Sequence, residues 1–189
     1  MRSSDQGLDH HERYRRAISV TDIFSGYEKC CADGDGGARD VAWAIEGNMM
    51  TPGCAYCAAA DSEAPEPFGG VVAADQQWLV TVGDPASTIA GALRIISRRH
   101  FIHFADMTAA EVTGFATLLA RLDAALRAVT DAERVHLVST RDRFEHFHAW
   151  LYPRSSDHPL RGTEFLNAPQ RSDPSEALTV ANAVRDQLR

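Results

Sequence analysis

The chain has 189 residues, of which 44% are hydrophobic and 24% are charged, a composition typical of one soluble domain with enough apolar mass for a core. Its 19 Lys and Arg against 26 Asp and Glu give a formal charge of -7, which argues against the clustered positive surface that binds a nucleic-acid polymer. No stretch approaches the roughly 20 apolar residues that cross a bilayer, and charges occupy the N-terminal positions where a signal peptide is apolar. We therefore expect a cytoplasmic protein that has no membrane contact.

The first 52 residues carry weak structural signals, and we interpret them as an N-terminal extension. A helix is one interpretation of residues 11–23, and the Gly/Asp-rich run at 33–37 is typical of a loop. The adjacent Cys30 and Cys31 have no further ligands at metal spacing. We interpret both as ordinary small side chains.

Residues 53–155 form the predicted domain, with short strands that are bounded by polar or turn residues. These strands are expected at 70–73, 78–82, 93–97, 135–139 and 147–152. One long helix interrupts them, and it begins with a Thr108-x-x-Glu111 capping box. Apolar residues then recur at steps of three and four and predict a stripe that faces the core. The stripe comprises Val112, Phe115, Leu119, Leu122, Leu126 and Val129.

Residues 156–189 form a C-terminal extension that ends in a second capped helix. Asp173 is the predicted N-cap, with Pro174 at the first helical position and Glu176 at the third. The residues expected to face inward are Leu178, Ala181, Val184 and Leu188. Together the elements predict an α+β fold: an antiparallel sheet with one long helix packed on a face, plus N- and C-terminal extensions.

The densest group of chemically active residues lies in the run HFHAWLYPR at 146–154. On a strand, alternation places His146, His148 and Trp150 on one face, and Phe147, Ala149 and Leu151 on the face toward the helix. The Cα atoms of the two histidines would then lie about 6.6 Å apart, close enough for one site. Paired surface histidines, or polar residues on a core strand, are the alternatives.

A C-x-x-C pair, Cys54 and Cys57, and the isolated His100 add further metal-ligand types. Two thiolates and two imidazoles make a closed tetrahedral zinc site, which is structural because no coordination position stays open. His103 is an alternative ligand to His100. A thioredoxin-type redox pair is the other interpretation of the cysteines, but such a pair is expected at a helix N-terminus after a strand, whereas Cys54 follows residues typical of a turn.

The order of these motifs resembles the histidine triad (HIT) superfamily, including its branch of galactose-1-phosphate uridylyltransferase. The resemblance covers residues 54–154: the C-x-x-C pair, the run GALRIISRRH at 91–100, similar to G-H-x-L-V-I-P-K-x-H, the capped helix, and the His-x-His strand that ends in Pro-Arg. It implies a HIT-like fold and a zinc ion bound by Cys54, Cys57, His100 and His146. It further implies that His148 is the nucleophile and, because relatives are commonly dimers, a homodimer.

Two departures from the family bear on the chemistry. The third histidine of the motif is replaced by Trp150, whose indole donates one hydrogen bond but accepts no proton. The turn at 140–145 is shorter than the phosphate-binding loop of many relatives, and we expect Arg143 to supply donors there and Ser139 to stand where the family has Asn. A solvated charged turn is the alternative.

The resemblance implies a hydrolase or nucleotidyltransferase in which neutral His148 attacks the α-phosphate of a small-molecule nucleotide or another phosphorylated substrate. Two alternatives stay open. One is a zinc-stabilised binding protein that has this fold without the reaction. The other is an enzyme with an open metal site, in which Glu145 or His103 completes a site begun by the strand histidines.

Overall fold

The structure is a computed structural model that describes residues 51, 53–60 and 66–189, all of which belong to one compact unit, Ile45–Arg189. The interpretations of residues 11–23, 30–31 and 33–37 lie outside this described part. None of the described helices combines the length and the apolar character of a membrane span.

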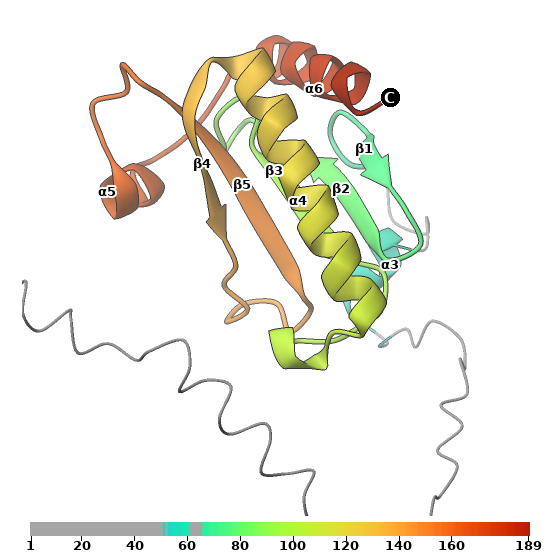
Figure 1. Ribbon diagram of the computed structural model, residues 1–189. Helices are drawn as coiled ribbons and strands as arrows, with labels where there is room; N and C mark the ends of the chain where they lie inside the picture. The colour runs from blue at the N-terminus through green and yellow to red at the C-terminus, as the bar shows by residue number, and fades with distance from the viewer. Residues whose placement is uncertain (1–50, 52, 61–65) are drawn as a thin grey trace, which may run out of the picture. The chain divides into compact units, whose positions relative to one another are not determined.

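Antiparallel strands form a five-stranded sheet in the order β1-β2-β3-β5-β4 (Figure 1). The strands are β1 (Val71–Ala74), β2 (Trp78–Val82), β3 (Leu93–Ser97), β4 (Ala132–Val138) and β5 (His148–Ser155). β2 and β3 have the predicted bounds. β1 begins at Val71 rather than at Gly70, because Gly70 has a φ of 69°, in the left-handed region that favours glycine.

The other two strands are shifted from their predicted bounds. β4 ends at Val138 rather than at residue 139, and β5 begins at His148 rather than at Phe147, whose N–H donates to the carbonyl oxygen of Phe101. β4 begins at Ala132, directly after the left-handed Asp131 (φ 51°) that ends the long helix, so a single residue connects the helix to the strand. β5 continues through Pro153 to Ser155. β3 pairs with β5 only as far as Leu151, so beyond that point β5 has β4 as its single described neighbour, and Pro153 removes no ladder bond to β3.

The helices are α3 (Ala55–Ala60), α4 (Ala109–Thr130), α5 (Gly162–Asn167) and α6 (Pro174–Leu188), with a 3-10 turn η2 (Phe104–Asp106) before α4. Both predicted caps are confirmed. The Glu111 N–H donates to Thr108 Oγ1 at 3.2 Å, and the Glu111 carboxylate accepts from the Thr108 N–H at 2.7 Å. The Asp173 carboxylate accepts from the N–H groups of Ser175 and Glu176.

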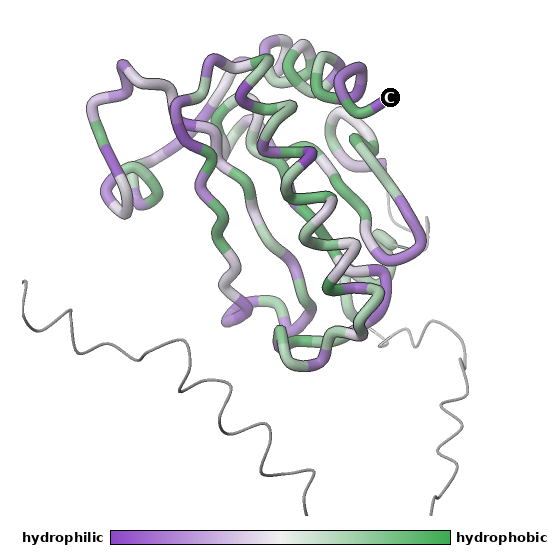
Figure 2. Tube along the Cα trace, viewed as in Figure 1, coloured by the Kyte–Doolittle hydropathy of each residue, from purple (hydrophilic) through white to green (hydrophobic). Residues whose placement is uncertain are grey.

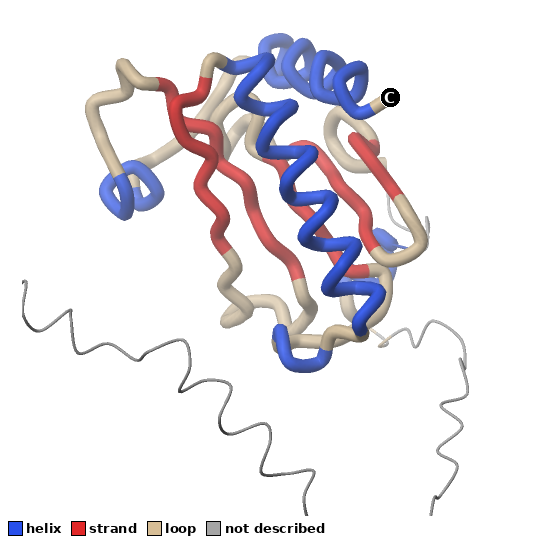
Figure 3. Tube along the Cα trace, in the orientation of Figure 1, coloured by secondary structure: helices blue, strands red, loops and turns tan. Residues whose placement is uncertain are grey.

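The main core lies between α4 and one face of the sheet (Figure 3). Figure 2 shows hydrophobic residues along the central strands and hydrophilic ones at the turns. Phe115, Leu122 and Leu126 face this core as predicted, but Val112 is 51% exposed. In the first turn Glu111 takes the inward position instead, since its carboxylate binds the guanidinium of Arg99. The inward line then continues through Leu118 and Ala125.

The C-terminal helix α6 packs on α4 and β1 (Figure 1). Ala181 and Val184 are buried as predicted, whereas Leu178 is 38% exposed. Ala177 lies one turn before Ala181 and is 2% exposed, so the inward line begins at Ala177 rather than at Leu178. The predicted α+β fold, an antiparallel sheet with one long helix on a face, is confirmed.

Candidate metal centre and adjoining cleft

The candidate site lies on the sheet face opposite α4, where α3 packs against β3. Alternation along β5 has the predicted sense: Phe147, Ala149 and Leu151 enter the core under α4. On the opposite face, the ring of Tyr56 from α3 lies 5.6 Å from the ring of His146 and 4.8 Å from that of His148. The short helix α3 therefore covers His148 at the start of β5 and His146 just before it.

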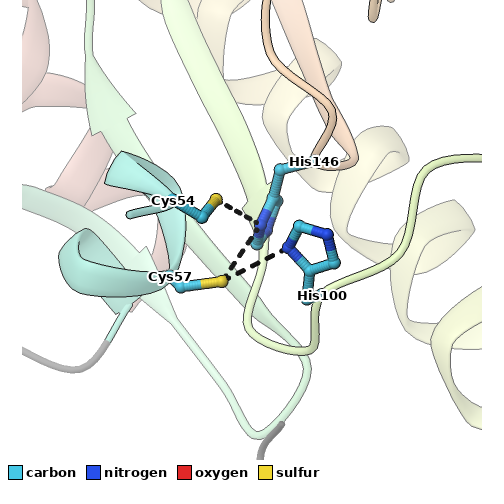
Figure 4. A group of neighbouring side chains, drawn as sticks. All are labelled: Cys54, Cys57, His100 and His146. Atoms are coloured by element: carbon cyan, nitrogen blue, oxygen red, sulfur yellow. Dashed lines mark hydrogen bonds between the residues drawn. The ribbon is translucent and has the colours of Figure 1, made fainter. Parts of the chain in front are cut away.

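Four side chains converge at one end of this face: Cys54, Cys57, His100 and His146 (Figure 4). Their ligand atoms all lie within 4.8 Å of one another. The sulfur atoms of Cys54 and Cys57 lie 3.4 and 3.5 Å from Nδ1 of His146, and Cys57 Sγ lies 3.4 Å from Nδ1 of His100. A tetrahedral zinc ion with bonds of about 2.3 Å to sulfur and about 2.0 Å to nitrogen separates these atoms by about 3.5 Å. The group can therefore hold a metal ion of this kind.

The ring of His146 is oriented for coordination by its backbone neighbour. Its Nε2 lies 2.8 Å from the carbonyl oxygen of Ser97 and 3.0 Å from Ser97 Oγ. A carbonyl oxygen only accepts, so Nε2 carries the hydrogen and Nδ1 presents its lone pair to the two sulfur atoms. Burial lowers the pKa of His146, and the hydrogen bond to Ser97 offsets this in part. His146 is thus held as a neutral ligand.

The position of the C-x-x-C pair differs from the one expected from the sequence. Cys54 follows a turn, since its N–H donates to the Thr51 carbonyl at 3.0 Å, but α3 begins directly after it, and the sequence did not predict this helix. The C-x-x-C pair therefore does lie at a helix N-terminus. The convergence of two histidines on the sulfur atoms is what favours a metal site over a redox pair. His103 is exposed and lies outside this group, as does Glu145.

His148 lies beside the cysteine–histidine group and is 4% exposed. Its Nδ1 lies 2.8 Å from the carbonyl oxygen of His146, so Nδ1 carries the hydrogen and Nε2 has the lone pair. Burial lowers the pKa of His148, the bond to His146 raises it in part, and the charges of Arg94 and Arg141 lower it further. These contributions favour the neutral ring, which is the form that a nucleophilic histidine needs.

His148 lines a cleft of ≈ 650 Å³ together with Trp150 and Arg143. Ser139 is not part of the cleft wall; its hydroxyl donates to the carbonyl oxygen of His148 at 2.6 Å and accepts from Arg141 at 2.6 Å. Ser139 therefore positions the strand that carries His148. A second cleft of ≈ 440 Å³, whose walls include Pro153 and residues of α6, contains none of His148, Trp150 and Arg143.

Sequence analysis missed Arg94 and Tyr56, which also line the larger cleft. The guanidinium carbon of Arg94 lies 5.2 Å from the ring centre of Tyr56 and 5.3 Å from that of Trp150. The available signal was the motif itself, because Arg94 stands where G-H-x-L-V-I-P-K-x-H has Leu, on a strand between the core residues Leu93 and Ile95. Because residues of a strand alternate between the two faces of the sheet, Arg94 faces away from the core, and core packing gives no reason for a charge at that position.

Comparison with known proteins identifies the fold. No protein-family model and no curated protein match the sequence. Among solved structures, a zinc-bound histidine triad family protein from Mycobacterium smegmatis matches with a TM-score of 0.57 and 21% identity over 75% of this chain and 97% of that one. A hypothetical histidine triad nucleotide-binding protein from Sulfolobus tokodaii matches with a TM-score of 0.55 and 14% identity, over 71% and 91% of the two chains.

A histidine triad protein from Bradyrhizobium japonicum also matches, with a TM-score of 0.53 and 16% identity over 63% of this chain and 90% of that one. At these identities the likeness shows the fold. The chain has the histidine triad fold, as the motifs at 54–57, 91–100 and 146–154 predicted.

Proposed function

We propose that the protein is a zinc-bearing enzyme that acts on nucleotides or related phosphorylated small molecules, as a hydrolase or nucleotidyltransferase with His148 as nucleophile. One observation carries the proposal: His148 is held as the Nδ1–H tautomer by the His146 carbonyl, in a cleft that has arginines in its wall. The likeness to structures described as zinc-bound and as nucleotide-binding histidine triad proteins supports it.

The metal in this proposal is structural. Cys54, Cys57, His100 and His146 would supply two thiolates and two Nδ1 atoms, which is a closed shell for zinc. Such an ion contributes folding free energy and leaves no position for substrate. It would hold His146, which precedes β5, in place, and with it the carbonyl oxygen that orients His148.

In the proposed reaction, Nε2 of His148 attacks the α-phosphorus. A nitrogen–phosphorus bond forms while the bond from phosphorus to the leaving oxygen breaks, and the leaving group departs with that electron pair. The ring becomes positively charged, and the His146 carbonyl oxygen, 2.8 Å from Nδ1, stabilises the charge through its hydrogen bond. Water or the hydroxyl of a second acceptor then attacks the phosphorus and gives its proton to solvent, a phosphorus–oxygen bond forms, and the nitrogen–phosphorus bond breaks with its electron pair returning to Nε2, so that neutral His148 is restored.

Intact-protein mass spectrometry tests this proposal. The zinc-loaded protein is incubated with a panel of nucleotide esters and phosphoramidates, and both adduct and released nucleotide are measured. We expect a nucleotidyl adduct or turnover in the wild type and neither in His148→Ala. His103→Ala is the matched control, since it removes an exposed imidazole outside the site and should behave like the wild type. Equal turnover in wild type and His148→Ala would contradict the proposal.

A second candidate is a binding protein that has this fold without the reaction. Trp150 favours it, because an indole in place of the third histidine of the motif cannot protonate a leaving group. Under this alternative the wild type binds nucleotide but forms no adduct and releases no product. An open-site metal enzyme has less support, because His148, Glu145 and His103 all lie outside the group of described residues that can share an ion.

Two finer assignments belong to the proposal. Kinship with the galactose-1-phosphate uridylyltransferase branch rests on the C-x-x-C pair and the order of the motifs, and Trp150 is a departure from that branch. A homodimer is expected by analogy with relatives, and sedimentation of the purified protein tests it.

A further inference from the structure

Arg94 is placed unusually for an arginine on a central strand. It lies on β3 between two fully buried core residues, and its own side chain points to the opposite face, into the cleft beside His148. Its Nε atom is buried, and within the described part of the chain it has no hydrogen-bond partner. A buried donor without an acceptor costs about 1–3 kcal/mol, so the protein without a ligand carries this cost at the Nε–H group of Arg94.

Two aromatic rings lie close to the guanidinium of Arg94, and they determine which of its atoms a ligand can reach. Tyr56 and Trp150 both lie within cation–π distance of the guanidinium, at 5.2 and 5.3 Å. Trp150 is the cross-strand partner of Arg94, and its ring is also stacked on that of Tyr152 at 5.8 Å. Rings that pack on the faces of a guanidinium leave its N–H groups, which lie in the guanidinium plane, for a ligand.

Among the described residues, no carboxylate forms an ion pair with Arg94. The ion pairs found among the described residues involve other arginines, such as Arg99 with Glu111 and Arg154 with Glu133. In the cleft wall as described, Asp142 is the single carboxylate, against Arg94 and Arg143. A local positive charge in a chain of formal charge -7 is therefore available for an anion.

We propose that Arg94 is a specificity-determining residue that binds an oxygen of a phosphate group on the ligand, beside His148. Its planar donors match a phosphate or carboxylate, and a ligand oxygen would satisfy the buried Nε–H. The inference rests on the proposed function for the identity of the anion as a phosphate, but it requires binding only. It also assigns a role to Trp150: in place of a polar side chain, its ring positions the arginine on the neighbouring strand.

Calorimetry with matched ligands tests the role. The full-length zinc-loaded protein is titrated with AMP, GMP, CMP and UMP, and separately with the corresponding nucleosides, which lack the phosphate. Arg94→Gln should weaken binding of the best monophosphate roughly 10- to 100-fold and leave nucleoside binding unchanged. Arg94→Lys should recover part of the loss, because it keeps the charge without the planar donors.

Arg127→Gln is the matched control, since it removes the same charge from an exposed position of α4 and should change neither affinity. Zinc content and melting temperature show that each variant is folded. The inference is wrong if Arg94→Gln binds monophosphate as tightly as the wild type, if it loses nucleoside binding equally, or if Arg127→Gln shows the same loss. A wild type that binds no monophosphate more tightly than its nucleoside also refutes it.

The result separates this inference from the proposed function. If the wild type shows neither adduct nor turnover but its monophosphate binding depends on Arg94, the function fails and the inference stands. If adducts form but monophosphate binding does not depend on Arg94, the function stands and the inference fails.

Discussion

Replacing Cys57 by Ser should remove the metal and lower stability without unfolding the domain. Cys57 is 2% exposed, and its sulfur lies within 3.5 Å of Nδ1 of both His100 and His146, so its loss opens the ligand shell. The main core between α4 and the sheet contains none of the four ligands. We therefore expect a folded protein that has lost the stabilisation that metal binding adds.

The magnitude follows from mass action. A ligand present at about a thousand times its Kd stabilises the folded state by about 4 kcal/mol. For a domain of about 150–250 residues, each kcal/mol moves the melting temperature by about 2–4 °C. Cys57→Ser, or chelation of the wild type, should thus lower the melting temperature by about 8–16 °C.

Differential scanning fluorimetry and metal analysis of the same samples measure both effects. Cys30→Ser is the control, because the same substitution is made at a cysteine that we interpret as outside any metal site. It should keep both metal and melting temperature. Purified wild type without metal, and with a melting curve that chelator does not move, would refute the assignment of these four residues as ligands.

Three further outcomes are expected. Glu111→Gln should lower the free energy of unfolding, measured in urea at pH 7, by about 1–2 kcal/mol. Burial alone raises the pKa of Glu111, but hydrogen bonds, chiefly from Arg99, outweigh burial and lower that pKa. A lowered pKa means that the carboxylate stabilises above its unfolded pKa and loses this effect as the pH falls through its folded pKa, so the difference from wild type should narrow below about pH 4. Ser97→Ala should weaken zinc binding about tenfold in a chelator competition, because a hydroxyl beside a ligand histidine is lost while the backbone carbonyl stays. Trp150→Phe should keep monophosphate binding within a few-fold, since a ring still packs on Arg94, whereas Trp150→Ala should weaken it; equal affinities of the two variants would contradict this role.

Local patterns predicted the parts of the fold that local interactions determine. The bounds of β2 and β3 follow from turn residues around apolar runs, and the start of α4 follows from the Thr108–Glu111 capping box. The four side chains that converge were predicted as metal ligands because the order of their motifs resembles that of the zinc-bearing members of the histidine triad superfamily.

Features that depend on tertiary contacts were not predictable in this way. α3 and α5 have 6 residues each, too few for helix propensity to specify them without packing partners. The core stripe of α4 was predicted one residue out of place at its start because an ion pair with the half-exposed Arg99 orients Glu111 inward. The position of Arg94 between two rings depends on pairing of β3 with β5, which no local window contains.

His146 takes part in two interactions with different parts of the molecule. Its ring faces the cysteines, while its backbone carbonyl holds the ring of His148. A change at Cys54 or Cys57 therefore reaches His148 through a single residue: oxidation of either sulfur would remove its contact with the ring of His146, and the bonds to Ser97 would remain to hold that ring. If His148 is the nucleophile proposed above, its activity should fall under oxidants before the domain unfolds, although His148 itself is chemically unchanged.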